Sequence, residues 1–302
     1  MKLKDVKKIG VIGCGSIGNT IAAAVATKYP VIVKELNEEL AALGLKRIKG
    51  CFPALVKRNA ITEVEQEIAI SRISMTTELK DLKDCQIIVD AVPDIMELKI
   101  SNFAELNKIC AADTVFTTTA SLLSVNAMAS GSGRPDRFVG THFNNPAHIM
   151  ALVEIAPAIE TSKEVTDFII TFMKDGLGKS TVLTKASPGY IVDYIFFPFL
   201  VRAIEALEIG LGTVEDIDNA IKLGLAHRMG PFELMDMFGN DSNVAGFQVM
   251  YEQFHDVRYA PPPTLVKLYE AGYLGQKVGK GWYIYDEKGK RVKPTDLNEI
   301  KR

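Results

Sequence analysis

One histidine and one glutamate stand in two short apolar runs within FVGTHFNNPAHIMALVEI, residues 138–155. His142 lies in the first run and Glu154 in the second, and a proline-containing turn joins them. If the first run is a strand, its side chains alternate between two faces. The side chain of His142 then lies on one face, and those of Thr141 and Phe143 lie on the other. A buried, unpaired carboxylate costs several kcal/mol or more, so Glu154 needs a partner, and His142 is the obvious one.

A histidine held by a carboxylate is suited to proton transfer. The carboxylate fixes the tautomer and orientation of the imidazole and stabilises its protonated form. Such a pair can act as a general acid and base near neutral pH. The alternative is a hydrogen-bonded histidine and an edge-strand glutamate with no chemistry between them. We take His142 and Glu154 as the candidate catalytic residues.

A GxGxxG pattern lies near the N-terminus, between an apolar strand at Ile9 to Ile12 and an alanine-rich helix at about Ser16 to Lys28. In this context the first glycine permits a tight turn, the second lets the backbone approach a pyrophosphate, and the third lets helix and strand pack closely. The N–H groups at the helix start then face the anion. The candidate cofactor-binding residues of this turn are Gly13, Gly15, Ser16, Ile17 and Gly18.

An acidic residue follows the next predicted strand, Val31 to Val33. Glu35 stands 22 positions after Gly13, where dinucleotide-binding folds keep the acid that bonds the adenosine ribose. A carboxylate there repels a 2′-phosphate, which favours NAD over NADP, although the adjacent Lys34 weakens this inference. The alternative is a strand, turn and helix that bind no nucleotide.

The elements that must position these residues change character along the chain. Strands alternate with helices up to about Lys185, which predicts an α/β, Rossmann-like domain at residues 1–186. A helical hairpin, Asn37 to Asn59 and Thr62 to Ser71, is inserted in it, and Thr62 begins a capping-box pattern. The remaining residues, 187–302, predict an all-helical C-terminal domain. Further predicted strands are Gln86 to Val89, Thr114 to Thr118 and Ser180 to Lys185.

Composition excludes some classes of function. Of 302 residues, 47% are hydrophobic and 24% are charged, which is typical of a globular protein of about two domains. A formal net charge of -2 leaves no basic stripe for nucleic acid, and no apolar run is long enough to span a bilayer. The start, MKLKDVKK, lacks the apolar core of a targeting signal. We therefore expect no nucleic-acid partner and no membrane association.

The four cysteines are scattered and form no CxxC pair, which indicates reduced thiols in a cytoplasmic protein. His142 and His148 lie six positions apart, but no nearby cysteine or acid completes a ligand set. We therefore expect no metal site.

Several motifs together resemble the L-3-hydroxyacyl-CoA dehydrogenase family, including the dehydrogenase portion of multifunctional fatty-acid oxidation proteins. The resemblance covers nearly the whole chain, and the motifs occur in the order and spacing of the family. They are GCGSIG, KELNEE, IIVDAVPD, TASLLSV, GTHFNNP, LVEI, SPGYIVD, KLGLAHRMGPFEL and GQKVGKGWYIYD.

The resemblance implies reversible hydride transfer between C3 of an L-3-hydroxyacyl-CoA and NAD, with His142 and Glu154 as the catalytic pair. It implies that Ser121 contacts substrate and that Asp94 and Lys99 lie near the nicotinamide ribose, although VPDIM is a variant of the usual sequence there. It also implies an eight-stranded, largely parallel sheet, and a homodimer formed through the C-terminal domain. The acyl-CoA is then expected between the domains, with Arg58 and its neighbour Lys57 near the CoA phosphates.

Three positions depart from the family pattern. Asp193 stands where the family has an asparagine that helps to hold the substrate, and Tyr194 replaces the arginine that follows. Asn144 replaces the second phenylalanine of the family's HFFNP motif. An aspartate keeps an acceptor for the substrate hydroxyl but loses the amide's donor to a ketone. We therefore expect Asp193 to contact the substrate and the activity to persist, with an altered pH dependence or substrate preference.

Two other functions stay open. The leading alternative is a dehydrogenase of a free hydroxy acid or a diketone, since relatives of this fold use non-CoA substrates. The basic hairpin favours CoA recognition only mildly. A protein of another class, a non-catalytic NAD-binding scaffold, would keep the same fold. The intact His142 and Glu154 pair argues against the scaffold, and Asp193 is the feature in its favour.

Overall fold

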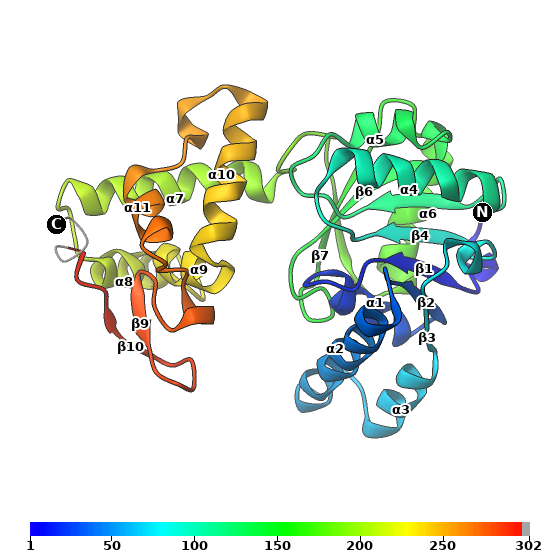
Figure 1. The fold of residues 1–302 in the computed structure, drawn as a ribbon, viewed down its shortest axis with the longest axis horizontal. Coiled ribbons are helices and arrows are strands. Elements are labelled where there is room, and N and C mark those ends of the chain that lie inside the picture. The colour runs from blue at the N-terminus through cyan, green and yellow to red at the C-terminus, as the bar shows by residue number, and fades with distance from the viewer. Residues whose placement is uncertain (298–302) are drawn as a thin grey trace. The chain divides into compact units, whose positions relative to one another are not determined.

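The computed structural model describes residues 1–297 of the chain. The chain divides after Tyr190 into two compact units (Figure 1). The sequence puts the boundary after Ala186, and those domain limits stay a prediction. No helix within residues 1–297 combines the length and the apolar character that a membrane crossing needs.

The N-terminal unit is built on one eight-stranded sheet. Its order is β3-β2-β1-β4-β5-β6-β7-β8, and the first six strands in that order run parallel. β7 runs antiparallel to β6, and β8 is parallel to β7, which confirms the largely parallel sheet. The strands are β1 (Ile9–Ile12), β2 (Val31–Lys34), β3 (Ile73–Thr76), β4 (Ile87–Asp90), β5 (Val115–Thr118), β6 (Phe138–Phe143), β7 (Leu152–Pro157) and β8 (Ser180–Leu183).

Helices cover both faces of this sheet. One core joins Val11 of β1 to Ile21 and Phe52 of the first two helices, and the other joins Phe103 and Phe116 to residues of α5. Strands buried on both faces need continuous apolar runs, as in β1, whose four residues are all buried. The helices are α1 (Gly18–Ala26), α2 (Glu38–Lys57), α3 (Glu63–Ser71), α4 (Met96–Ile109), α5 (Val125–Gly131) and α6 (Lys163–Thr171).

The predicted helical hairpin is α2 and α3, and both of its helix starts are capped by side chains. Asn37 accepts a hydrogen bond from the backbone N–H of Leu40. Thr62 and Glu65 form the predicted capping box, in which each side chain satisfies a backbone N–H of the other residue.

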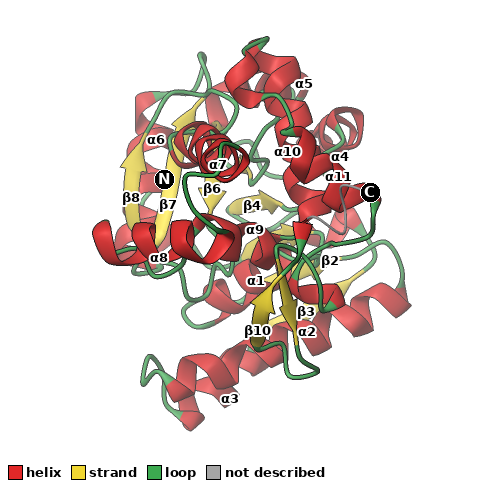
Figure 2. Ribbon diagram, turned by 90° about the vertical axis from the view of Figure 1, so that its left-hand side faces the viewer, coloured by secondary structure: helices red, strands yellow, loops and turns green. Residues whose placement is uncertain are grey.

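The C-terminal unit is mainly helical, as predicted, but it also contains one antiparallel hairpin (Figure 2), which the sequence analysis did not predict. The hairpin is held by Asp236, a buried residue whose carboxylate accepts from the backbone N–H groups of Trp282 and Tyr283 and from the hydroxyl of Tyr285. The elements are α7 (Val192–Glu208), α8 (Val214–Gly224), α9 (Pro231–Phe238), α10 (Asn240–Phe254), α11 (Pro263–Glu270), β9 (Tyr283–Tyr285) and β10 (Arg291–Pro294).

Candidate active site

His142 and Glu154 face each other across the antiparallel pair of β6 and β7. The register sets the two residues directly opposite, where side chains on one face of the sheet can touch. The imidazole Nδ1 and the carboxylate Oε2 lie 2.8 Å apart, and the side chains are 7% and 1% exposed. The buried carboxylate therefore has the partner that its burial requires.

This geometry selects one tautomer of the histidine. Because Glu154 accepts at its Oε2, Nδ1 carries the proton and Nε2 becomes the nitrogen that can exchange a proton with a bound molecule. Glu154 also stabilises an imidazolium that forms in such a step. The arrangement can therefore act as a general base and, when protonated, as a general acid.

The glycines of the first turn have different surroundings. Gly13 has φ +87, and a Cβ there would lie 2.7 Å from the carbonyl oxygen of Ala91. A Cβ on Gly18 would lie 2.1 Å from the carbonyl oxygen of Gly13, so helix and turn are in close contact. A Cβ on Gly15 would meet no atom within 4 Å. The space beside Gly15 therefore lies where a pyrophosphate is expected in this type of fold.

Ser16 and Ile17 complete the turn, and Ile17 is the N-cap of α1. Glu35 follows β2 and lies against the same turn, because its Oε1 accepts from the backbone N–H of Cys14 at 2.5 Å and its Oε2 from that of Leu36 at 3.1 Å. A carboxylate in this position can accept hydrogen bonds from the ribose hydroxyls of a dinucleotide. The donor set of the turn thus fits NAD.

Lys99 is enclosed rather than exposed to a ligand. Its Nζ lies 2.9 Å from Oδ2 of Asp90, 3.2 Å from Oδ1 of Asp94 and 2.8 Å from the carbonyl oxygen of Val92. Its side chain is 0% exposed, whereas that of Asp94 is 46% exposed. Asp94 is therefore the exposed member of this ion pair, and its role toward a ligand stays a prediction.

Sequence reasoning missed Asp90 and Thr118, which close this network. The hydroxyl of Thr118, at the end of β5, donates to Oδ2 of Asp90 at 2.9 Å. Burial raises the pKa of the Asp90 carboxyl, and the neighbouring Lys99 ammonium opposes that shift. The position of Asp90, an acid at the end of an apolar strand, was the signal available in the sequence.

The predicted substrate-binding residues lie in three places. Ser121 follows β5, and its carbonyl oxygen accepts from the backbone N–H of Gly189 at 2.8 Å. Lys57 ends α2 and Arg58 caps it, and both are exposed. Asp193 lies in the first turn of α7 in the C-terminal unit, so its place beside His142 stays a prediction.

Arg58 acts electrostatically on the segment between β6 and β7. Burial lowers the pKa of His148 in that segment, and the positive charges of Lys179 and Arg58 lower it further. Lys179 is anchored there, since its Nζ donates to the carbonyl oxygens of Ala147 and Met150. Two positive charges therefore lie close enough to His148 to affect its pKa.

Sequence reasoning also missed Tyr190, which appeared there only as part of the motif SPGYIVD. Its ring stacks on the imidazole of His142 with centroids 4.7 Å apart. The two residues are 48 positions apart, and nothing local in the sequence indicates the contact.

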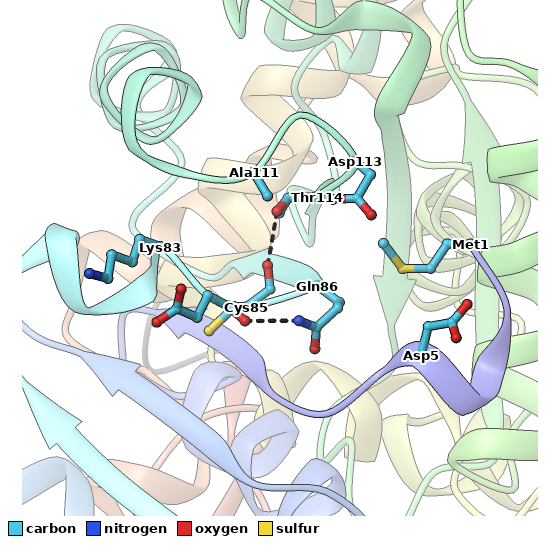
Figure 3. Close-up of a pocket in the computed structure, with 9 residues that line it drawn as sticks. Met1, Asp5, Lys83, Cys85, Gln86, Ala111, Asp113 and Thr114 are labelled. Carbon is cyan, nitrogen blue, oxygen red and sulfur yellow. Dashed lines mark hydrogen bonds between the residues drawn. The ribbon is translucent and has the colours of Figure 1, made fainter.

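A cavity of about 340 Å³ lies at the N-terminal ends of β4 and β5 (Figure 3). Its lining includes Lys83 to Gln86, which precede β4, and Thr114, which precedes β5, together with Met1, Asp5, Ala111 and Asp113. The candidate site lies where β4 and β5 end, so this cavity is separate from it. Within residues 1–297, no three His, Cys, Asp or Glu side chains are grouped so that they could hold a metal ion.

Comparison with known proteins identifies both parts of the chain. Residues 8–187 match the model described as 3-hydroxyacyl-CoA dehydrogenase, NAD binding domain, and residues 189–285 match the C-terminal domain of the same family. The N-terminal match makes NAD the cofactor of this fold. A 3-hydroxybutyryl-CoA dehydrogenase of Bradyrhizobium diazoefficiens is 36% identical over 291 residues, 96% of this chain and 98% of that protein.

Solved structures agree. The crystal structure of (S)-3-hydroxybutyryl-CoA dehydrogenase from Ralstonia eutropha is similar to this chain, with a TM-score of 0.86 at 32% identity. The match covers 93% of this chain and 100% of the chain of that enzyme. A diketoreductase structure has a TM-score of 0.82 at 25% identity and covers 93% of this chain and 99% of its own.

The open space at Gly15 gives a prediction. Gly15→Ala should fold normally but raise the Kd for NADH by about tenfold or more, because a methyl group would keep the pyrophosphate from the backbone. Fluorescence titration with NADH measures this effect. Gly50→Ala is the matched control, since a Cβ there also meets no atom within 4 Å. An unchanged Kd in Gly15→Ala would show that no phosphate approaches this turn.

Proposed function

This chain belongs to the 3-hydroxyacyl-CoA dehydrogenase family, and from that premise we propose that it interconverts an L-3-hydroxyacyl-CoA and the 3-ketoacyl-CoA with NAD. The buried His142 and Glu154 pair carries the proposal, since a carboxylate-held imidazole supplies the proton transfer that this oxidation needs. The names of the relatives make a short 3-hydroxyacyl group the first substrate to test.

The mechanism divides the work between cofactor and protein. NAD, when bound, supplies the hydride acceptor at the nicotinamide. His142 takes the hydroxyl proton of the substrate at Nε2 in the oxidative direction, and Glu154 stabilises the imidazolium that results. In reduction, the imidazolium of His142 donates the proton to the ketone oxygen. Acid and base catalysis of this kind is worth about 10²–10⁴-fold in rate.

We assign the substrate contacts to four residues. Ser121 and Asp193 are proposed to hold the reacting end of the acyl group, since each offers an acceptor to a hydroxyl. Arg58 and Lys57 are proposed to bind CoA phosphates, which is supported by their exposure and by the effect of Arg58 on His148. The residues proposed to bind NAD are Gly13, Gly15, Ser16, Ile17, Gly18, Glu35, Asp94 and Lys99. Of these, Lys99 is proposed to act through its ion pair with Asp94.

The leading alternative is a dehydrogenase of a diketone or a free hydroxy acid. It is favoured by one observation, the diketoreductase that shares this fold at 25% identity over 93% of the chain. A non-catalytic scaffold has less support, because it gives no reason to bury an acid beside a histidine.

Two expectations about the whole protein are also proposals. A homodimer through the C-terminal unit is supported by large apolar side chains that stand exposed near the ends of α7 and α8, since such surface is usually covered by a partner. These side chains are Ile209, Leu211, Leu223 and Leu225. A cytoplasmic location is supported by four cysteines that are all buried and unpaired.

The reaction itself is tested by NADH oxidation with acetoacetyl-CoA. We expect turnover that requires both CoA and NADH, and little with free acetoacetate or with NADPH, because Glu35 would repel a 2′-phosphate. Turnover of the free acid alone would contradict the acyl-CoA assignment. Binding of NADH without turnover of any substrate would favour the scaffold.

The charge of Glu154 is tested by Glu154→Gln. The amide keeps the shape of the side chain but cannot stabilise the imidazolium, so kcat should fall by about 10²–10⁴-fold while the Kd for NADH stays unchanged. Steady-state kinetics and NADH titration measure the two effects. Glu160→Gln, the same change at an exposed site after β7, is the control and should leave kcat unaltered.

The departure at Asp193 is tested by Asp193→Asn. An asparagine offers an N–H donor to a ketone oxygen, whereas an ionised aspartate does not, so the KM for acetoacetyl-CoA should fall. An ionised carboxylate also favours the protonated form of a neighbouring base, so the pH profile of kcat/KM should shift. Glu205→Gln on the same helix is the control. Kinetics and a pH profile identical to those of the natural protein would remove Asp193 from the mechanism.

A further inference from the structure

Tyr190 packs flat against the histidine of the candidate catalytic pair. The ring planes of Tyr190 and His142 differ by 14° and their centroids are 4.7 Å apart. Both side chains are buried, with 4% and 6% exposed. The imidazole therefore has Glu154 at its Nδ1 edge and an aromatic ring over one face.

The hydroxyl of Tyr190 makes a second connection. It donates to the carbonyl oxygen of Ala120 at 3.1 Å, in the residue before Ser121. The adjacent Gly189 donates its backbone N–H to the carbonyl oxygen of Ser121 at 2.8 Å. One short segment thus contacts both His142 and the loop that carries the proposed substrate serine.

The backbone at Tyr190 is strained in order to make these contacts. Its φ is +49, a conformation that costs a residue other than glycine about 1–2 kcal/mol. Strained conformations persist only where the surrounding structure holds them, and they gather at functional sites. The stack on His142 and the hydrogen bond to Ala120 are among the contacts that hold Tyr190 in this conformation.

The strand that carries His142 also leaves room for the tyrosine. Gly140 lies two residues before His142 and so faces the same side of β6. A Cβ on Gly140 would lie 2.7 Å from the hydroxyl oxygen of Tyr190. The absence of a side chain at Gly140 therefore leaves room for the hydroxyl of Tyr190.

We propose that Tyr190 is a positioning residue for His142. Glu154 fixes one edge of the imidazole, and Tyr190 fixes its plane, so that Nε2 keeps a single direction. The face of the phenol ring is negative and also stabilises a stacked imidazolium. The kinetic part of this inference rests on the proposed function, and the geometric part does not.

Two substitutions separate the stack from the hydroxyl bond. Tyr190→Leu removes the ring, and we expect kcat to fall by about 10- to 100-fold, since small losses of alignment are costly in proton transfer. Tyr190→Phe keeps the ring and should restore most of kcat. Its KM for acetoacetyl-CoA should rise about two- to tenfold, because the loop of Ser121 loses one hydrogen bond.

A spectroscopic measurement tests the geometry without turnover. In protein labelled with ¹³C and ¹⁵N at its four histidines, His142→Gln identifies the signals of His142. The ring protons of His142 should be shifted upfield by the stacked phenol. The shift should persist in Tyr190→Phe, and it should be lost in Tyr190→Leu and in Gly140→Ala.

Tyr29→Leu is the matched control, since Tyr29 packs on Phe172 elsewhere in the same unit. It should change neither kcat nor the His142 signals. The proposal is overturned if Tyr190→Leu keeps the natural kcat and the upfield shift, or if Tyr29→Leu lowers kcat equally. If the natural protein turns over no substrate, the proposed function fails, and the ring-proton shifts alone decide whether Tyr190 positions His142.

Discussion

The requirement that a buried carboxylate be paired governs the N-terminal unit. Glu154 is 1% exposed within an apolar strand, and its cost is offset by the imidazole directly opposite. That pairing depends on the reversal of β7, because an antiparallel neighbour needs only a short connection and aligns residues in opposed pairs. A parallel β7 would need a longer crossover and would set a different neighbour beside His142.

The same sheet brings the cofactor turn and the acid–base pair to one edge. β1, β4, β5 and β6 run parallel, so the residues at their carboxyl ends lie along a common edge, where ligands of such sheets bind. The buried network of Asp90, Lys99 and Thr118 lies at the ends of β4 and β5, between the glycine turn and His142. A polar network with its partners satisfied is rigid. It therefore keeps the two halves of the site in a fixed relation.

The features that sequence could predict are those that local patterns specify. The glycine turn, the capping box of α3 and the opposition of His142 and Glu154 follow from spacing within a few residues or between adjacent strands. β3 was missed because ISMT is short and polar at a sheet edge, and β9 with β10 because the hairpin is held by Asp236 from a distant helix. The burial of Lys99 and the stack of Tyr190 depend on packing between distant segments, which leaves no periodic signal.

Buried carboxylates in the two units show why a shifted pKa does not by itself make a carboxylate catalytic. Burial raises the pKa of Asp236 to about 6, a value that would suit proton transfer. Yet its oxygens are occupied by two backbone N–H groups and a tyrosine hydroxyl, and a Cβ on Gly281 would lie 2.0 Å from one of them. Those donors belong to the hairpin of β9 and β10, so the carboxylate serves to hold it. Glu154 is bonded instead to an imidazole, whose second nitrogen can pass a proton on. The two buried carboxylates are therefore distinguished by their hydrogen-bond partners.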